Sequence, residues 1–203
     1  MVVSKKRMSS RMVSKQQQLR WLQEGRGQGQ LDTYKPFLNV RDNKSLTERS
    51  SRVYGYKTQR THHLFSDLEL ALFLALDRIQ DIEDIREQIP LDLETTVQIA
   101  EDLKIPHPIE QNVHQIITST FFIVNHSPLK PPCFVVKALK STHLELKRTI
   151  AQLELERRYW EQKNIPWFLF TEKDISSTAI DNIKWLYPLN KVNNDIYTFS
   201  KMD

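Results

Sequence analysis

Two short apolar runs near the middle of the chain place the strongest limit on its fold. Residues 116–124 and 134–139 are rich in Ile, Val and Phe, and Pro128, Pro131 and Pro132 lie between them. Proline has no backbone N–H to donate to a strand ladder, so the two runs cannot form one continuous element. The pattern predicts two buried strands joined by a turn.

The flanking sequence predicts helices that alternate with further strands. Apolar residues at helical spacing predict a helix over 64–79 that is buried on most sides, with Ser66 placed to cap it. Residues 82–91 fit either type of element, and their β-branched side chains and terminal proline favour a strand. The remaining periodicity predicts helices over 93–103, 144–163 and 177–186 and a strand over 166–171. This order is typical of an α/β sandwich with a mixed sheet.

Length and composition narrow the class of protein. A chain of 203 residues with 39% hydrophobic and 27% charged residues can bury the core of one domain with a short appendage. Its apolar runs are too short to span a bilayer, so no membrane role is expected. The basic N-terminus lacks the apolar stretch of a secretory signal, and Cys133 has no second cysteine to pair with. We therefore expect a cytoplasmic protein.

Charge is distributed unevenly along the chain. Residues 1–63 carry fourteen Lys or Arg and four acids, whereas residues 64–203 carry fifteen and twenty-one. Such a basic segment can lie along a polyanion, and nucleic acid is the first candidate. The alternative is a solvated basic tail.

The stretch EGRGQGQ, residues 24–30, holds three of the four glycines in the protein. Such a concentration indicates unusual backbone angles, or a close approach to another chain or to a phosphate. Its spacing is not that of a dinucleotide-binding loop. A flexible turn after a short helix is the alternative.

Several long strings carry a family resemblance, in order and with similar spacing: EGRGQGQ, KTQRTHHLFSDLELALFLAL, DIREQIPL, KIPHP, LELERRYWEQKNIPWFLFTEKDI and NIKWLY. From about residue 20 to 187 the chain resembles the TnsA endonuclease subunit of heteromeric cut-and-paste transposons. The resemblance implies a restriction-endonuclease-like core, a mixed β-sheet flanked by helices, with a basic helical or loop arm before it. We expect the arm over 1–60, the nuclease domain over 61–176, and a short C-terminal helix and tail over 177–203. The C-terminal helical domain with which family members contact TnsC is expected to be missing.

The resemblance also implies a function, a cofactor and partners. TnsA proteins are Mg²⁺-dependent DNA endonucleases that cut the 5′ ends of the transposon. A TnsB transposase acts on the 3′ ends, and a TnsC AAA+ regulator connects both to target selection. The implied ligands of this chain are therefore transposon-end DNA, a TnsB-like subunit, a TnsC-like regulator and Mg²⁺.

Matching the family motifs to this chain gives an incomplete catalytic set. The helix glutamate in SDLE corresponds to Glu69, the strand lysine to Lys137, and the later glutamate in LELERR to Glu156. The resemblance makes these residues catalytic, with Glu69 and Glu156 as weak metal ligands. The family aspartate of S-T-D-F is replaced by Phe121, and the glutamine two residues before the lysine is replaced by Val135.

These two replacements predict impaired metal binding. Phe121 offers no oxygen, and Asn125, on the same strand face, lies roughly 13 Å further along. Simpler roles exist for the remaining three residues. Glu69 can be a helix cap, Glu156 a charge on the helix surface, and Lys137 half of a buried ion pair.

Three functional hypotheses follow. The leading one is a TnsA-like subunit with a degraded metal site that binds transposon ends and assembles with TnsB-like and TnsC-like partners. The second is an active Mg²⁺-dependent endonuclease of the same family, and the third is a regulatory protein that blocks cutting. In the leading hypothesis, five basic residues contact DNA phosphates: Arg26, Arg49, Arg52, Lys57 and Arg60.

Overall fold

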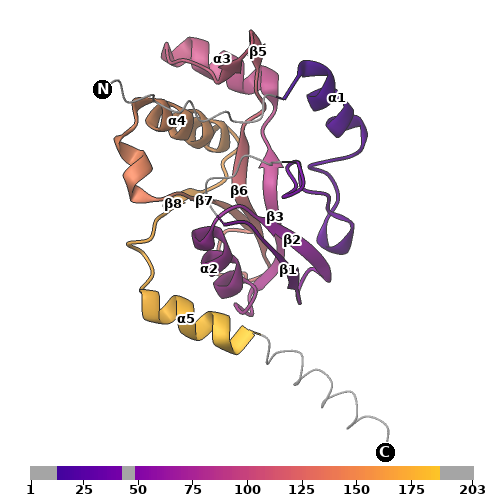
Figure 1. Ribbon diagram of the computed structural model, residues 1–203, viewed down its shortest axis with the longest axis vertical. Helices are drawn as coiled ribbons and strands as arrows, with labels where there is room; N and C mark the ends of the chain where they lie inside the picture. The colour runs from indigo at the N-terminus through magenta and orange to yellow at the C-terminus, as the bar shows by residue number, and fades with distance from the viewer. Residues whose placement is uncertain (1–12, 43–48, 188–203) are drawn as a thin grey trace, which may run out of the picture.

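A computed structural model of the protein describes residues 13–42 and 49–187 (Figure 1). Within these ranges the central feature is a four-stranded sheet in the order β3, β6, β7, β8. β3 (Ile82–Pro90), β6 (Thr118–Asn125) and β7 (Cys133–Ala138) pair antiparallel, and β8 (Trp167–Phe170) pairs parallel to β7. The predicted mixed sheet and its four strands are confirmed.

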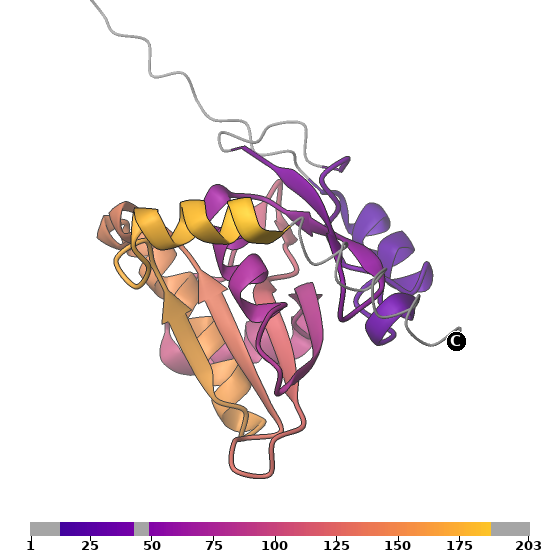
Figure 2. The same ribbon diagram turned by 90° about the horizontal axis from the view of Figure 1, so that it is seen from below.

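Helices cover both faces of this sheet (Figure 2). α2 (Asp67–Leu76) packs on one face, and α5 (Ser177–Leu186) lies against α2. α4 (Lys147–Gln162) packs on the other face beside α3 (Leu93–Leu103). The alternation of strand residues divides the core in two, because Val136 packs under α2 and Val135 packs under α4. The predicted helices are all present, but α2 is three residues shorter than expected at each end and α4 begins three residues later than expected.

The smaller elements frame the two faces. They are α1 (Lys15–Gln23), β1 (Ser51–Gly55), β2 (Arg60–Leu64), β4 (Ile109–Glu110), β5 (Val113–His114) and the 3₁₀ turns η1 (Leu31–Thr33) and η2 (Ser141–Glu145). Within the described ranges, no helix combines the length and apolarity that a membrane span requires.

The sequence did not predict the β1–β2 hairpin. Its strands read SRVYG and RTHHL, which are too polar to show a buried strand by composition. A buried ion-pair cluster holds the hairpin to the sheet. The carboxylate of Glu87 in β3 accepts two hydrogen bonds from the Arg60 guanidinium, at 2.8 and 2.6 Å, and its Oε2 lies 2.7 Å from His62 Nδ1. The predicted boundary at residue 60 falls inside this hairpin, and the division into three segments stays a prediction.

The glycine-rich loop packs against its own chain. Gly25 takes a left-handed conformation (φ 76°) just after α1, where its N–H donates to Leu22 O and that of Arg26 to Trp21 O. These two bonds end the helix in a Schellman motif. Gly27 (φ 82°) lies so close to β3 that a Cβ there would be 2.3 Å from the ring of Pro90. The predicted unusual backbone angles are confirmed, and the close approach is to Pro90.

Parts of the predicted arm and tail, residues 1–12, 43–48 and 188–203, lie outside the described residues.

Candidate functional site

The candidate site lies where the two central strands separate. The pairing of β6 with β7 reaches only as far as Phe121 and Val136. Beyond this pair, the N–H of Ala138 donates to the side-chain Oγ1 of Thr120 at 3.1 Å. Side chains therefore fill the space between the two strands at this end of the sheet.

The edge of the site is marked by a local change of strand face. In β3, Gln88 has a left-handed φ of 50°, and Ile89 beyond it packs in the core under α4. In β6, Phe121 packs under α2, whereas the Oγ of Ser119 accepts a hydrogen bond from Trp160 Nε1 of α4 at 2.8 Å. Strict alternation would place residues 119 and 121 on one face. The distortion separates them and turns the start of β6 toward α4.

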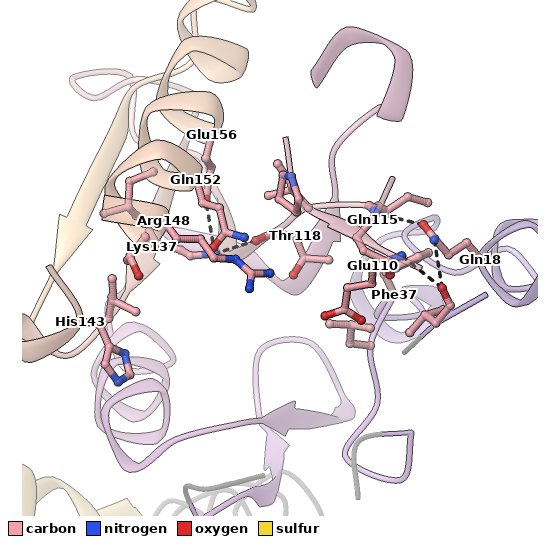
Figure 3. Close-up of a pocket in the computed structure, with 18 of the residues that line it drawn as sticks. Gln18, Phe37, Glu110, Gln115, Thr118, Lys137, His143, Arg148, Gln152 and Glu156 are labelled. Carbon is pink, nitrogen blue, oxygen red and sulfur yellow. Dashed lines mark hydrogen bonds and ion pairs between the residues drawn. The ribbon is translucent and has the colours of Figure 1, made fainter. Parts of the chain in front are cut away.

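Lys137 and Glu156 meet in this space (Figure 3). Lys137 Nζ lies 3.1 Å from Glu156 Oε2 and donates to the carbonyl of Thr118 at 2.8 Å. The other carboxylate oxygen of Glu156 accepts from Trp167 Nε1 at 3.1 Å. Glu156 is only 1% exposed, so it is a buried charge that is both paired and hydrogen-bonded. The simpler role predicted for Lys137, half of a buried ion pair, matches this geometry.

A pocket of about 490 Å³ opens beside this ion pair. One wall is formed by α4, whose Arg148, Gln152 and Glu156 follow each other at four-residue spacing and so share a face. Gln18 and Phe37 lie on the opposite side (Figure 3). Arg148 and Gln152 were not predicted as site residues, although their four-residue spacing from Glu156 was a signal in the sequence.

The other predicted site residues lie apart from this pocket. Glu69 is on α2, on the opposite face of the sheet from α4, and does not line the pocket. Its carboxylate accepts the N–H of Phe65 at 2.7 Å, and its own N–H donates to the Ser66 cap. Phe121 is fully buried in the core under α2, with its ring centroid 6.4 Å from that of Phe73. Among the described residues, no three His, Cys, Asp or Glu side chains are grouped so that they could hold a metal ion.

Asn125, the nearest replacement oxygen considered for the metal site, is engaged elsewhere. Its Oδ1 accepts from Ser127 N at 3.0 Å and its Nδ2 donates to Pro131 O at 3.4 Å. It therefore stabilises the turn between β6 and β7.

Two of the five predicted phosphate-binding residues are engaged in internal pairs. Arg60 is 9% exposed and bound to Glu87, and Arg26 donates to Asp42 Oδ2 at 2.5 Å. In this structure both guanidiniums have internal carboxylate partners, and their contact with DNA stays a prediction. Arg49 and Arg52 are exposed and Lys57 is half-buried.

A row of three hydrogen-bonded side chains, Thr58, His62 and Glu87, resembles a catalytic relay, but a substrate cannot reach it because it is buried. His62 bridges Glu87 and the hydroxyl of Thr58, with both contacts at 2.7 Å. All three side chains are fully buried. Burial alone would raise the pKa of Glu87, but the neighbouring His62 and Arg60 outweigh it and lower that pKa to about 2. We interpret this cluster as the attachment of the hairpin to the sheet.

The fold and this site define a class of protein. The chain has a mixed α/β fold with a lysine–glutamate pair where the central strands part, and residues 80–172, which include both residues, match the family described as TnsA-like endonuclease N terminal. The chain belongs to this TnsA-like family. Among its relatives is the transposon Tn7 transposition protein TnsA of Escherichia coli, which is 46% identical over 169 residues. The match covers 83% of this chain and 61% of that relative, so the chain spans less than two thirds of the relative's length.

Proposed function

We propose that the protein is a TnsA-like transposition subunit that binds transposon DNA ends and assembles with TnsB-like and TnsC-like partners, and that its nuclease centre no longer holds Mg²⁺. Membership in the TnsA-like endonuclease family supports a restriction-endonuclease-like core. The similarity to a transposition protein supports a role in transposition.

The position of Phe121 carries the proposal that the centre is degraded. Hydrolysis of a phosphodiester with Mg²⁺ needs hard oxygen ligands at about 2.0–2.1 Å in near-octahedral geometry. At the β6 position where the resemblance implies an aspartate, this chain has a phenyl ring that is 0% exposed and packed against Phe73. That ring supplies no oxygen and contributes to the core.

The surviving carboxylates are already occupied. Both oxygens of Glu156 have partners, in Lys137 and Trp167. The carboxylate of Glu69 accepts a main-chain N–H at the start of α2. These residues do not fit a Mg²⁺ centre, because an ion would have to displace internal partners without gaining a carboxylate from β6.

A DNA surface remains on the hairpin side of the molecule. Arg49 and Arg52 are exposed, and Lys57 lies in the turn between β1 and β2. Exposed arginines and lysines bind phosphates and release counterions, so this surface would bind DNA in a salt-dependent way.

Cleavage and binding assays test the proposal together. A supercoiled plasmid carrying a transposon end, incubated with the full chain, its TnsB-like partner and Mg²⁺ or Mn²⁺, should show no strand breaks that depend on this protein. Cleavage that disappears in Lys137→Ala would instead establish the active endonuclease. That alternative keeps one supporting observation, because the family lysine is present and lies in the pocket.

Binding of end DNA should depend on the hairpin residues. Replacing Arg49, Arg52 and Lys57 by Gln should weaken binding. The slope of log K against log[salt] should become shallower by about 0.9 for each phosphate that is no longer neutralised. The matched control replaces Lys163, Lys173 and Lys184, three lysines of α5 and the loops near α4 and β8, by Gln. Equal binding by the two triple variants would contradict a DNA surface on the hairpin and would favour a regulator that contacts protein alone.

A further inference from the structure

The α4 wall of the pocket carries polar side chains that the fold itself does not use. We propose that Arg148, Gln152 and His143 form a contact site for a phosphate of a DNA strand that enters the pocket beside Lys137 and Glu156. This inference rests on the proposed binding of DNA ends and names the residues that would hold the strand at the former catalytic centre.

The three side chains come from α4 and from the turn just before it. Arg148 and Gln152 are four residues apart on α4, in the turns before Glu156, and His143 comes from η2 just before the helix. All three line the pocket, and Figure 3 shows Arg148 and Gln152 next to Lys137. Arg148 and His143 are exposed and Gln152 is half-buried. The site is therefore open to an incoming strand.

Apart from Glu156, the polar side chains of the proposed contact site have no internal partners among the described residues, in contrast to the arginines of the outer face of the same helix. On the outer face, Arg157 and Arg158 both pair with Glu154 and Glu161. In the part of the chain that the structure describes, the side chain of Arg148 forms no hydrogen bond or ion pair. Within the same described ranges, this is also true of the side chains of Gln152 and His143. Among the described residues, helix α4 thus pairs the two half-buried arginines of its later turns and leaves the exposed Arg148, which lines the pocket, without a side-chain partner.

The charge balance of this wall favours an anion. Glu156 pairs with Lys137, so among the described residues that line this wall the guanidinium of Arg148 is a positive charge without a carboxylate partner. A guanidinium presents five N–H donors in a planar fork that matches phosphate oxygens, and the Gln152 amide adds two further donors. Glu110 also lines the pocket but lies on the side away from α4 (Figure 3). Because its carboxylate repels an anion, a bound phosphate is expected to lie against α4.

The size of the pocket favours a nucleic-acid strand over a free phosphate ion. Sites for organic ligands have volumes of about 300–1,000 Å³, and this pocket has a volume of about 490 Å³. That volume holds a phosphate together with the sugar attached to it.

The test compares the salt dependence of DNA binding for the full chain and its variants. Fluorescence anisotropy with a single-stranded and a duplex transposon-end oligonucleotide would be measured over a range of KCl concentrations. Arg148→Gln should weaken binding several-fold and reduce the slope of log K against log[KCl] by about one, the value for one phosphate contact. Gln152→Glu, which places a carboxylate on the same wall, should also weaken binding.

The matched control is Lys147→Gln, which removes one positive charge one residue away, at an exposed position that does not line the pocket. It should leave the slope close to that of wild type. The proposed contact site would be wrong if the slope were unchanged in Arg148→Gln or reduced equally in Lys147→Gln. The proposed function would still stand in that case, provided that the wild-type protein binds DNA. Absence of salt-dependent DNA binding by wild type would instead remove the proposed function.

Inorganic phosphate distinguishes the source of the anion. At equal ionic strength it should compete with DNA more than chloride does for wild type and not for Arg148→Gln. A phosphate-induced rise in melting temperature that requires Arg148, without any DNA binding, would overturn a DNA strand as the ligand. Circular dichroism of each variant would show that the fold is kept.

Discussion

Phe121 occupies a position where its whole side chain is enclosed by the core under α2. At the same point of β6, Ser119 faces the opposite side of the sheet and bonds Trp160. A carboxylate at residue 121 would be buried among Phe73 and its neighbours without a cation, which is costly for a charged group. The phenyl ring at residue 121 is therefore part of the core under α2.

Phe121→Ala should destabilise the protein by about 3–5 kcal/mol, because truncating a buried phenylalanine removes apolar packing and leaves a cavity. Urea unfolding followed by circular dichroism measures the change. Phe168→Ala is the control, since Phe168 lies on the same sheet but is 54% exposed. Its cost should be below about 1 kcal/mol. Similar costs for the two variants would show that the Phe121 ring is not part of the core.

At the scale of elements, the glycine-rich loop follows α1 and packs against the end of β3. Gly25 and Gly27 both have left-handed φ values, but of these two only Gly27 lies within contact distance of another element. The hydrogen bond from Gly27 N to Lys35 O, 2.6 Å long, holds the loop in place over Pro90. Substitution of Gly25 therefore measures the free-energy cost of the left-handed backbone alone, and substitution of Gly27 measures that cost together with the cost of close packing.

Gly25→Ala should cost about 1–2 kcal/mol, the penalty of a left-handed L-residue, since a Cβ there meets no atom within 4 Å. Gly27→Ala adds an overlap with the Pro90 ring at 2.3 Å. Its total cost should reach at least about 3 kcal/mol. Denaturant unfolding of the two variants gives the difference directly, and equal costs would contradict the packing of the loop against β3.

At the scale of the whole molecule, one buried cluster joins the N-terminal part to the sheet. Arg60 contacts Glu87, Ile85 O and Leu31 O, and so ties β2, β3 and η1 together. The Tyr34 hydroxyl donates to Glu87 O at 2.9 Å in the same region. The segment that the charge pattern predicts to be an arm is therefore attached, over its described residues, at the same residue of β3 that orders the hairpin.

Acid should weaken this attachment over a defined range of pH. The folded-state pKa of Glu87, about 2, lies below its ordinary value of 4.5. The stabilisation is therefore complete above pH 4.5 and decreases as the pH falls toward 2, with a total on the order of 3 kcal/mol. Urea midpoints measured from about pH 6 to about pH 2 would show the decrease.

Glu87→Gln should be strongly destabilised near neutral pH because Arg60 is left buried without its anion. Its urea midpoint should then change less between pH 4.5 and 2 than that of wild type. Glu83→Gln, at an exposed position on the same strand, should keep both the stability and the acid slope of wild type. An acid slope in Glu87→Gln equal to that of wild type would assign the titration to another group.

Local spacing was enough to predict the strands of the central sheet and the helices on its two faces, and the family resemblance singled out Lys137 and Glu156, which the structure brings together. Hydrophobic periodicity reports which side of an element is buried, and long unusual strings report the family. The same information was insufficient for the β1–β2 hairpin and for the internal ion pairs of Arg26 and Arg60. Polar strands lack the apolar alternation on which such predictions depend. The carboxylates of Asp42 and Glu87, which pair with Arg26 and Arg60, are 16 and 27 residues away in the sequence.

The tertiary structure alone decided which charges meet. Arg60 pairs with Glu87, which is 27 residues away, and Lys137 of β7 pairs with Glu156 of α4. Next to the distorted Gln88, Ser119 and Phe121 face opposite sides of the sheet, although strict alternation would place them on the same side. Ion pairs and strand distortions of this kind depend on how distant segments pack and on the low dielectric of the interior, neither of which is encoded in local spacing.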